Sequence, residues 1–163
     1  MSTPETYEFK KEGNYYSFIT ANFAVYQVKF SDGSFFFNNF PPDLTIYDFV
    51  ISQPVLSGDR NPPYDIRIER TIVAIISAFL SEKENSVIYI CDDSDNRHHI
   101  RKRKFDGWFK KNQTGDLEKY ESELYFRGVE VFSTLLIHKD NPNKDILVGL
   151  FYKQESELKN EKP

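Results

Sequence analysis

The chain has 163 residues, 21 Lys and Arg against 25 Asp and Glu, and therefore a net charge of −4. With 39% hydrophobic residues and a single cysteine, this composition excludes a disordered tail, a fibrous repeat and a disulfide scaffold. The N-terminus is polar and the longest apolar stretch is far shorter than a membrane span. We therefore expect one cytoplasmic domain over residues 1–154 with no membrane partner, and a frayed, charged tail over residues 155–163.

The first fifty residues predict an antiparallel β-meander that is rich in Phe and Tyr. Residues 16–30 alternate between apolar and polar positions and indicate two strands. Asp32-Gly33 favours a tight hairpin turn, because this pair tolerates the positive φ that such a turn requires. Phe35-Phe36-Phe37 would then begin a third strand, and residues 44–52 are a fourth candidate.

A helix is predicted over residues 66–80, where the spacing of apolar residues changes to a period of 3.6. Asp65 immediately precedes it and has the side chain of an N-cap residue. The continuous apolar run over residues 87–91 indicates a buried strand. Because this strand lies between two helices in the sequence, it could pair in parallel with a neighbour.

A second helix is expected over residues 96–111, followed by an ambiguous segment over residues 117–126. Residues 131–138 and 146–152 are predicted to form a C-terminal hairpin. Grouped strands of this kind favour an α+β domain. We expect a mostly antiparallel sheet of about six or seven strands, with the two main helices packed on one face.

The segment over residues 91–109 concentrates charge. Between Arg97 and Lys111 there are seven Lys or Arg and one Asp, a net of +6, so the rest of the chain carries −10. On a helix, Arg97 and Arg101 fall on the same side as Trp108 and therefore need acidic partners. Asp92 and Asp95 are the nearest acids in the sequence, and Glu69 is a more distant candidate.

Four interpretations of this segment remain open. In the first, Asp95 or Ser94 caps the helix, the acids hold the arginines, and Trp108 fills the core. In the second, the outer cations contact the phosphates of a nucleic acid. In the third, the acids and a histidine form a metal-binding or phosphate-processing site, and in the fourth, the helix docks onto an acidic protein. The candidate surface cations are Lys102, Arg103, Lys104, Lys110 and Lys111, and the candidate metal ligands are Asp92, Asp93 and Asp95.

Other reactive residues give weaker signals. His98 and His99 are adjacent, so on a helix they point about 100° apart and are not expected to bind one ion together. Cys91 follows four apolar residues and has the pattern of a small buried side chain. No catalytic residue and no cofactor is predicted. The function expected is a binding module that uses the basic helix, and a homodimer is possible; the alternative is a metal-dependent enzyme that acts on a phosphate-containing substrate.

The run Cys91-Asp92 with Asp95, followed by Arg97, Arg101, Phe105 and Trp108, resembles the signature of a family of short uncharacterised bacterial proteins. The aromatic early strands and the helix start at Asp65 fit the same pattern, so the resemblance covers most of the chain. It implies a domain of unknown function. It does not imply an activity, a cofactor or a catalytic residue.

Overall fold

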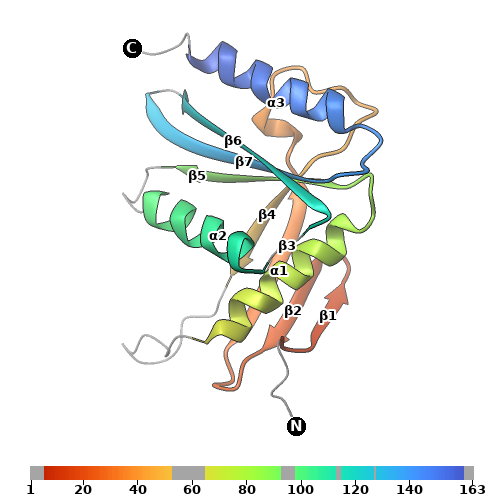
Figure 1. Cartoon of the computed structure of the whole chain (residues 1–163), viewed down its shortest axis with the longest axis vertical. Helices are drawn as coiled ribbons and strands as arrows, with labels where there is room; N and C mark the ends of the chain where they lie inside the picture. Colours follow the sequence, from red (N-terminus) through yellow and green to blue (C-terminus); the bar gives the residue numbers. More distant parts are fainter. Residues whose placement is uncertain (1–5, 53–64, 93–97, 113–114, 127, 160–163) are drawn as a thin grey trace.

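The computed structural model describes residues 6–52, 65–92, 98–112, 115–126 and 128–159. Within these residues, seven strands form one sheet in the order β1-β2-β3-β4-β5-β7-β6, and three α-helices pack against it (Figure 1). The strands are β1 (Phe9–Glu12), β2 (Tyr15–Ile19), β3 (Val25–Asp32), β4 (Tyr47–Ser52), β5 (Ser86–Asp92), β6 (Leu117–Phe126) and β7 (Val129–His138). The helices are α1 (Ile66–Leu80), α2 (His98–Asn112) and α3 (Lys144–Lys159), with a short 3-10 helix η1 (Ser34–Phe36).

The sheet is antiparallel except at one junction, where β4 and β5 run parallel. Parallel neighbours need a crossover connection, and α1 lies in the connection between these two strands. The predicted α+β fold with a mostly antiparallel sheet is confirmed, as is the parallel pairing of the strand over residues 87–91. No helix of the described residues is long and apolar enough to cross a membrane.

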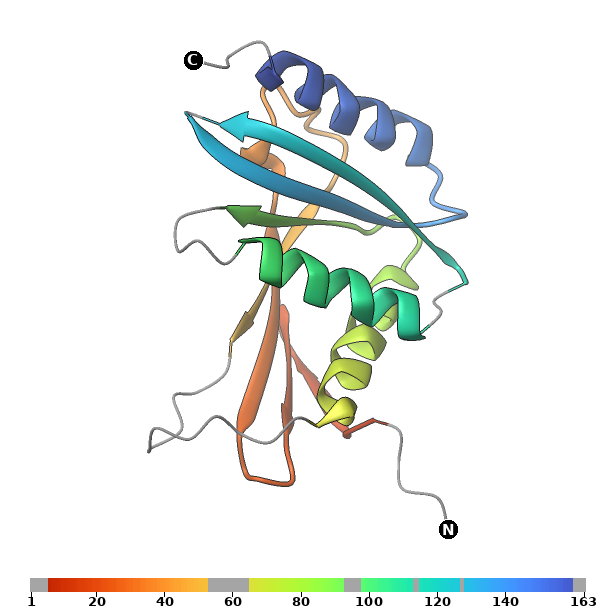
Figure 2. The ribbon, with the colours of Figure 1, turned by 60° about the vertical axis from the view of Figure 1, so that its left-hand side comes forward.

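The two faces of the sheet carry separate cores. Val87 and Leu136 point towards the aromatic and Ile-rich core under α1 and α2. Their neighbours Ile88 and Leu135 point to the other face, where they pack with Phe151 of α3. Successive side chains of a strand alternate between faces. The prediction of two helices on one face therefore holds for α1 and α2, while α3 covers the opposite face (Figures 1 and 2).

The predicted hairpin at Asp32-Gly33 and the strand at Phe35-Phe36-Phe37 are wrong. Gly33 has a φ of −101°, outside the range that requires glycine, and the chain then forms η1. What Gly33 provides is close approach of two backbones: a Cβ here would lie 2.9 Å from the backbone nitrogen of Asp48. The aromatic run therefore leaves the sheet, and Phe37 packs in the second core.

The predicted strand over residues 146–152 is also wrong, because these residues belong to α3. Leu147, Phe151 and Gln154 are buried at helical spacing, whereas Ile146 and Tyr152 are exposed. The C-terminal hairpin consists instead of β6 and β7. The charged residues up to Lys159, which were expected to fray, continue the helix; residues 160–163 lie outside the described part of the chain.

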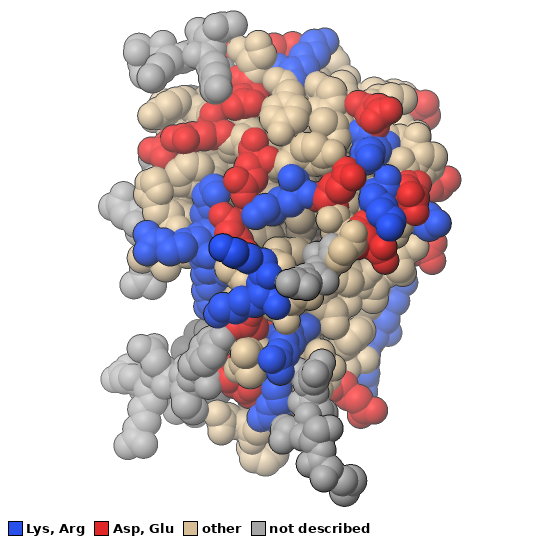
Figure 3. All heavy atoms as spheres, in the orientation of Figure 1, with Lys and Arg blue, Asp and Glu red and all other residues tan. Residues whose placement is uncertain are grey.

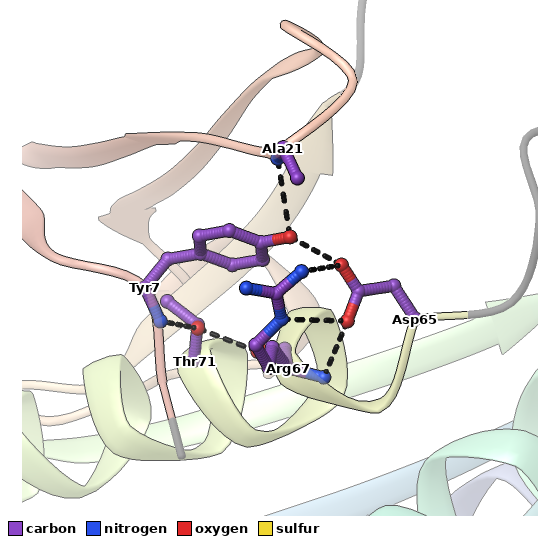
Figure 4. Close-up of polar contacts among 5 residues, drawn as sticks. All are labelled: Tyr7, Ala21, Asp65, Arg67 and Thr71. Atoms are coloured by element: carbon purple, nitrogen blue, oxygen red, sulfur yellow. Dashed lines mark hydrogen bonds and ion pairs between the residues drawn. The ribbon is translucent and has the colours of Figure 1, made fainter. Parts of the chain in front are cut away.

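A cluster around Asp65 joins the N-terminal segment to α1 (Figure 4). As predicted, Asp65 caps the helix, accepting a hydrogen bond from the backbone N–H of Arg67 at 3.0 Å. The Arg67 side chain donates two more hydrogen bonds to the same carboxylate, and the hydroxyl of Tyr7 donates another. The guanidinium of Arg67 also lies over the Tyr7 ring, 4.5 Å from its centroid. Although burial alone would raise the pKa of Asp65, the hydrogen bonds from Tyr7 and Arg67 hold it below its ordinary value.

We predict that Tyr7→Phe lowers the free energy of unfolding by about 1 kcal/mol at neutral pH, because the carboxylate loses one hydrogen bond. A lowered native pKa gives stability that is present above the unfolded pKa of about 4 and is lost as the pH falls through the native pKa. The variant should therefore lose less stability than the native protein between about pH 5 and pH 3. Urea unfolding at several pH values measures both effects.

Tyr15→Phe is the matched control, because its hydroxyl donates a hydrogen bond to Glu12 at an exposed position. Hydrogen bonds at exposed positions contribute little, so we expect a clearly smaller loss of stability than in Tyr7→Phe. Equal losses in the two variants would contradict a special role for the Asp65 cluster.

Candidate functional site

The parallel strands β4 and β5 separate soon after they meet. They pair only at Tyr47 with Val87 and at Asp48 with Ile88. Beyond these pairs β4 stays with β3, and β5 stays with β7. Figure 2 shows the two strands parting, with α2 alongside the opening. In open sheets, ligands commonly bind at the carboxyl ends of parallel strands that part in this way.

Three stacked aromatic rings hold α2 beside this opening. The ring of Phe105 stacks on that of Tyr89 with a centroid distance of 4.3 Å and an interplanar angle of 15°. Tyr89 in turn stacks on Phe49 of β4 at 4.9 Å and 20°. Phe105 is 3% exposed. The stack therefore links both parting strands to the middle of α2.

The opening forms a cleft of about 540 Å³ between β4, β5 and α2. On the helix side it is lined by Arg101, Lys104 and Trp108, and on the strand side it includes Asp48 and Tyr89. The Lys104 ammonium lies 5.3 Å from the centroid of the Trp108 ring. Trp108, which one interpretation of the sequence places in the core, is half-buried: it packs against the core under α1 and α2 and also borders the cleft.

Burial raises the pKa of three groups in and beside the cleft, Asp48, Tyr89 and Cys91. Burial raises the pKa of the Cys91 thiol, although the hydroxyl of Tyr89 and the guanidinium of Arg101 act in the opposite direction. Burial and a hydrogen bond to Cys91 likewise raise the pKa of Tyr89, and burial raises that of Asp48. Cys91 is therefore a buried thiol, as its sequence pattern predicts. The cleft combines the cations Arg101 and Lys104 of α2 with the carboxyl group of Asp48 on β4.

The outer face of α2 carries four of the predicted surface cations. Arg103, Lys104, Lys110 and Lys111 are exposed, and none of them forms an ion pair with a residue that the structure describes. All four are three or four positions from Gly107, so their side chains surround it on the helix surface. A Cβ at Gly107 would meet nothing within 4 Å. We call these four cations and Gly107 the cationic face.

Lys102, the fifth predicted surface cation, lies elsewhere. Its ammonium is 2.7 Å from Asp106 and 3.6 Å from Glu121 of β6. Lys119 of β6 pairs with the same two carboxylates, at 3.2 and 3.0 Å. These four alternating charges link α2 to β6. Lys102 therefore belongs to the packing of the helix and not to its exposed face.

The acids predicted at the start of α2 are not tested by this geometry. Asp93, Asp95, Arg97 and the side chain of Asp92 lie outside the described residues. Their roles as caps, as partners of Arg101 or as metal ligands stay predictions. The cleft residues Asp48, Phe49 and Tyr89 were not identified from the sequence. Strand periodicity shows which residues are apolar, but the cleft exists only because β4 and β5 part.

We predict that Gly107→Ala raises the free energy of unfolding by about 0.5–1 kcal/mol, since alanine has the higher helix propensity and the position is open. Gly149→Ala in α3, another open helical position, is the matched control and should have a similar effect. Chemical denaturation measures both. A loss of stability in Gly107→Ala alone would show that the centre of the cationic face is packed and not open.

Comparison with known proteins places the chain in a family. Residues 64–153, more than half of the chain, match the model of a family of unknown function, DUF6169. The chain belongs to this family. The match includes α1, α2 and the strands β5–β7, and the N-terminal meander precedes it. Searches of curated proteins and of solved structures found no match.

Proposed function

We propose, for this member of a family of unknown function, that it is a binding module for single-stranded nucleic acid. The observation that carries the proposal is the cationic face of α2: four exposed cations without ion-pair partners among the described residues, arranged around a glycine. Cations on helix surfaces are often solvated. Here, however, two acids beside the helix, Asp106 and Glu121, are already paired with Lys102 and Lys119.

The dimensions of the cationic face suit a phosphate backbone. From Arg103 to Lys111 the helix rises about 12 Å, which is enough for two or more phosphates of an extended strand. Gly107 leaves the centre of the cationic face without a side chain, so the phosphate backbone of a nucleic acid can approach the helix closely. Figure 3 shows Lys and Arg side chains gathered over α2, with Asp and Glu side chains around and above them over β6 and α3.

The cleft beside the cationic face supports a single strand in preference to a duplex. Single strands are bound by basic surfaces combined with aromatic rings on which unpaired bases stack. Trp108 and Lys104 border both the cleft and the cationic face, and Phe35 at the far side of the cleft is 72% exposed. A volume of about 540 Å³ is large enough for one base and its sugar.

The test is fluorescence anisotropy with a labelled 12-nucleotide single strand of mixed sequence. With about four phosphates contacted, the slope of log K against log salt should be about −3. The affinity should therefore fall about 50-fold between 50 and 200 mM KCl. The emission of Trp108, the single tryptophan of the chain, should change on binding if a base enters the cleft.

Replacing Arg103, Lys104, Lys110 and Lys111 together by Ala should weaken binding at least tenfold while Tm stays within about 2 °C of the native value. The control replaces four exposed lysines away from α2 by Ala, with the same change in net charge: Lys10, Lys11, Lys29 and Lys153. Equal weakening by both sets, or affinity independent of salt, would refute the proposal. Stronger competition by a duplex than by a single strand would refute the role of the cleft.

A further inference from the structure

The two adjacent histidines at the start of α2 converge on one carboxylate. Glu130 of β7 faces the first turn of α2, and the Nε2 atoms of His98 and His99 each lie 3.7 Å from its Oε1 atom. The ligand atoms that the three side chains offer all lie within 4.8 Å of one another. The two adjacent histidines therefore do not point apart as helix geometry predicts: both rings turn towards the same carboxylate.

The spacing of these atoms fits a metal ion better than a hydrogen bond. N–H···O hydrogen bonds have heavy-atom distances of about 2.7–3.2 Å, so 3.7 Å is too long for either imidazole. Zinc is bound by His nitrogen and carboxylate oxygen at about 2.0–2.1 Å. In a tetrahedral site, bonds of that length place neighbouring ligand atoms about 3.3 Å apart. Movements of a few tenths of an ångström would bring each histidine to that distance from Glu130. The two histidine ligand atoms, which lie within 4.8 Å of each other, would also have to approach that distance.

His98 provides an independent indication of a ligand. Its residue exposure is 7%, and neither of its ring nitrogens has a hydrogen-bond partner among the residues that the structure describes. Buried polar atoms are normally satisfied, and an unsatisfied one costs free energy. A metal ion bound at Nε2 would satisfy the atom that faces Glu130.

The ring of Phe132 packs against the rings of both histidines. Its ring stacks on that of His98 with a centroid distance of 5.3 Å and an angle of 22°, and it meets His99 edge-on at 4.9 Å. Glu130 and Phe132 are two residues apart on β7 and so share the face that meets α2. The aromatic ring therefore orients the two imidazoles towards the carboxylate and limits the access of water from one side.

We propose that His98, His99 and Glu130 bind a divalent transition-metal ion of the zinc class. Two imidazoles and one carboxylate suit such an ion, whereas Mg²⁺ prefers oxygen ligands and retains several waters. The His99 side chain is 60% exposed and that of Glu130 is 25% exposed, so the site opens to solvent. Three protein ligands leave a fourth tetrahedral position for water or for an exogenous ligand. This site is at the N-terminal end of α2 and does not depend on nucleic-acid binding by the cationic face.

The experiment is isothermal titration of the chelator-treated full chain with ZnCl₂, with MgCl₂ as the comparison. We expect one Zn²⁺ per chain at micromolar or tighter affinity and no measurable Mg²⁺ binding. A ligand that binds only the native state raises Tm. At a free Zn²⁺ concentration of 100 times Kd, the rise in Tm should be about 5 °C or more. Substitution with Co²⁺ should give the visible absorption bands of a tetrahedral ion.

His99→Ala and Glu130→Gln should each weaken Zn²⁺ binding at least tenfold. His99 is exposed, so its removal should leave the fold intact, as the Tm without metal will show. The matched controls are His138→Asn, which replaces the third histidine of the chain, and Glu84→Gln, which replaces an exposed carboxylate away from α2. Both should bind Zn²⁺ like the native protein. The absence of Zn²⁺ binding, or binding that survives in both His99→Ala and Glu130→Gln, would overturn the proposal.

Discussion

The stack of Phe105 on Tyr89 and Phe49 determines where α2 lies, and both candidate sites depend on α2. The helix is mostly polar, and among its described side chains only His98, Phe105 and Phe109 are buried. Burying a side chain of the size of Phe contributes about 2–3 kcal/mol, more than the surface ion pairs of Lys102 contribute. Without the stack, neither a cleft nor a fixed cationic face would exist.

The aromatic stack also explains how the helix can remain so highly charged. Because the buried aromatic side of α2 supplies the packing energy, the other sides of the helix need not be apolar. Lys102 and Asp106 orient the helix on β6, His98 and His99 face β7, and the remaining cations face solvent. Each group of polar side chains thus has a different neighbour, although all belong to the same four turns.

The elements that can be predicted best from the sequence are those with a strong hydrophobic period and a helix-capping residue. α1 was expected over its observed range with Asp65 as N-cap, because Ile spacing and capping chemistry agree. Phe35-Phe36-Phe37 and residues 146–152 were predicted to be strands, since local β-propensity does not reveal that Gly33 must pack on Asp48 or that Phe151 fills a second core. The convergence of His98 and His99 depends on Glu130, 31 positions beyond His99 in the sequence, so helix geometry alone could not reveal it.

The net charge of −4 does not argue against a polyanionic partner, because the relevant charge is local. At physiological ionic strength, interactions between exposed charges are largely screened beyond about 8 Å. The cationic face spans about 12 Å of helix, so a strand lying on it interacts mainly with those four cations. Two acids beside the helix, Asp106 and Glu121, are paired with Lys102 and Lys119, which offsets their charge. The pairing of Lys102 thus removes one cation from the exposed surface, and the other four form no ion pair with a residue that the structure describes.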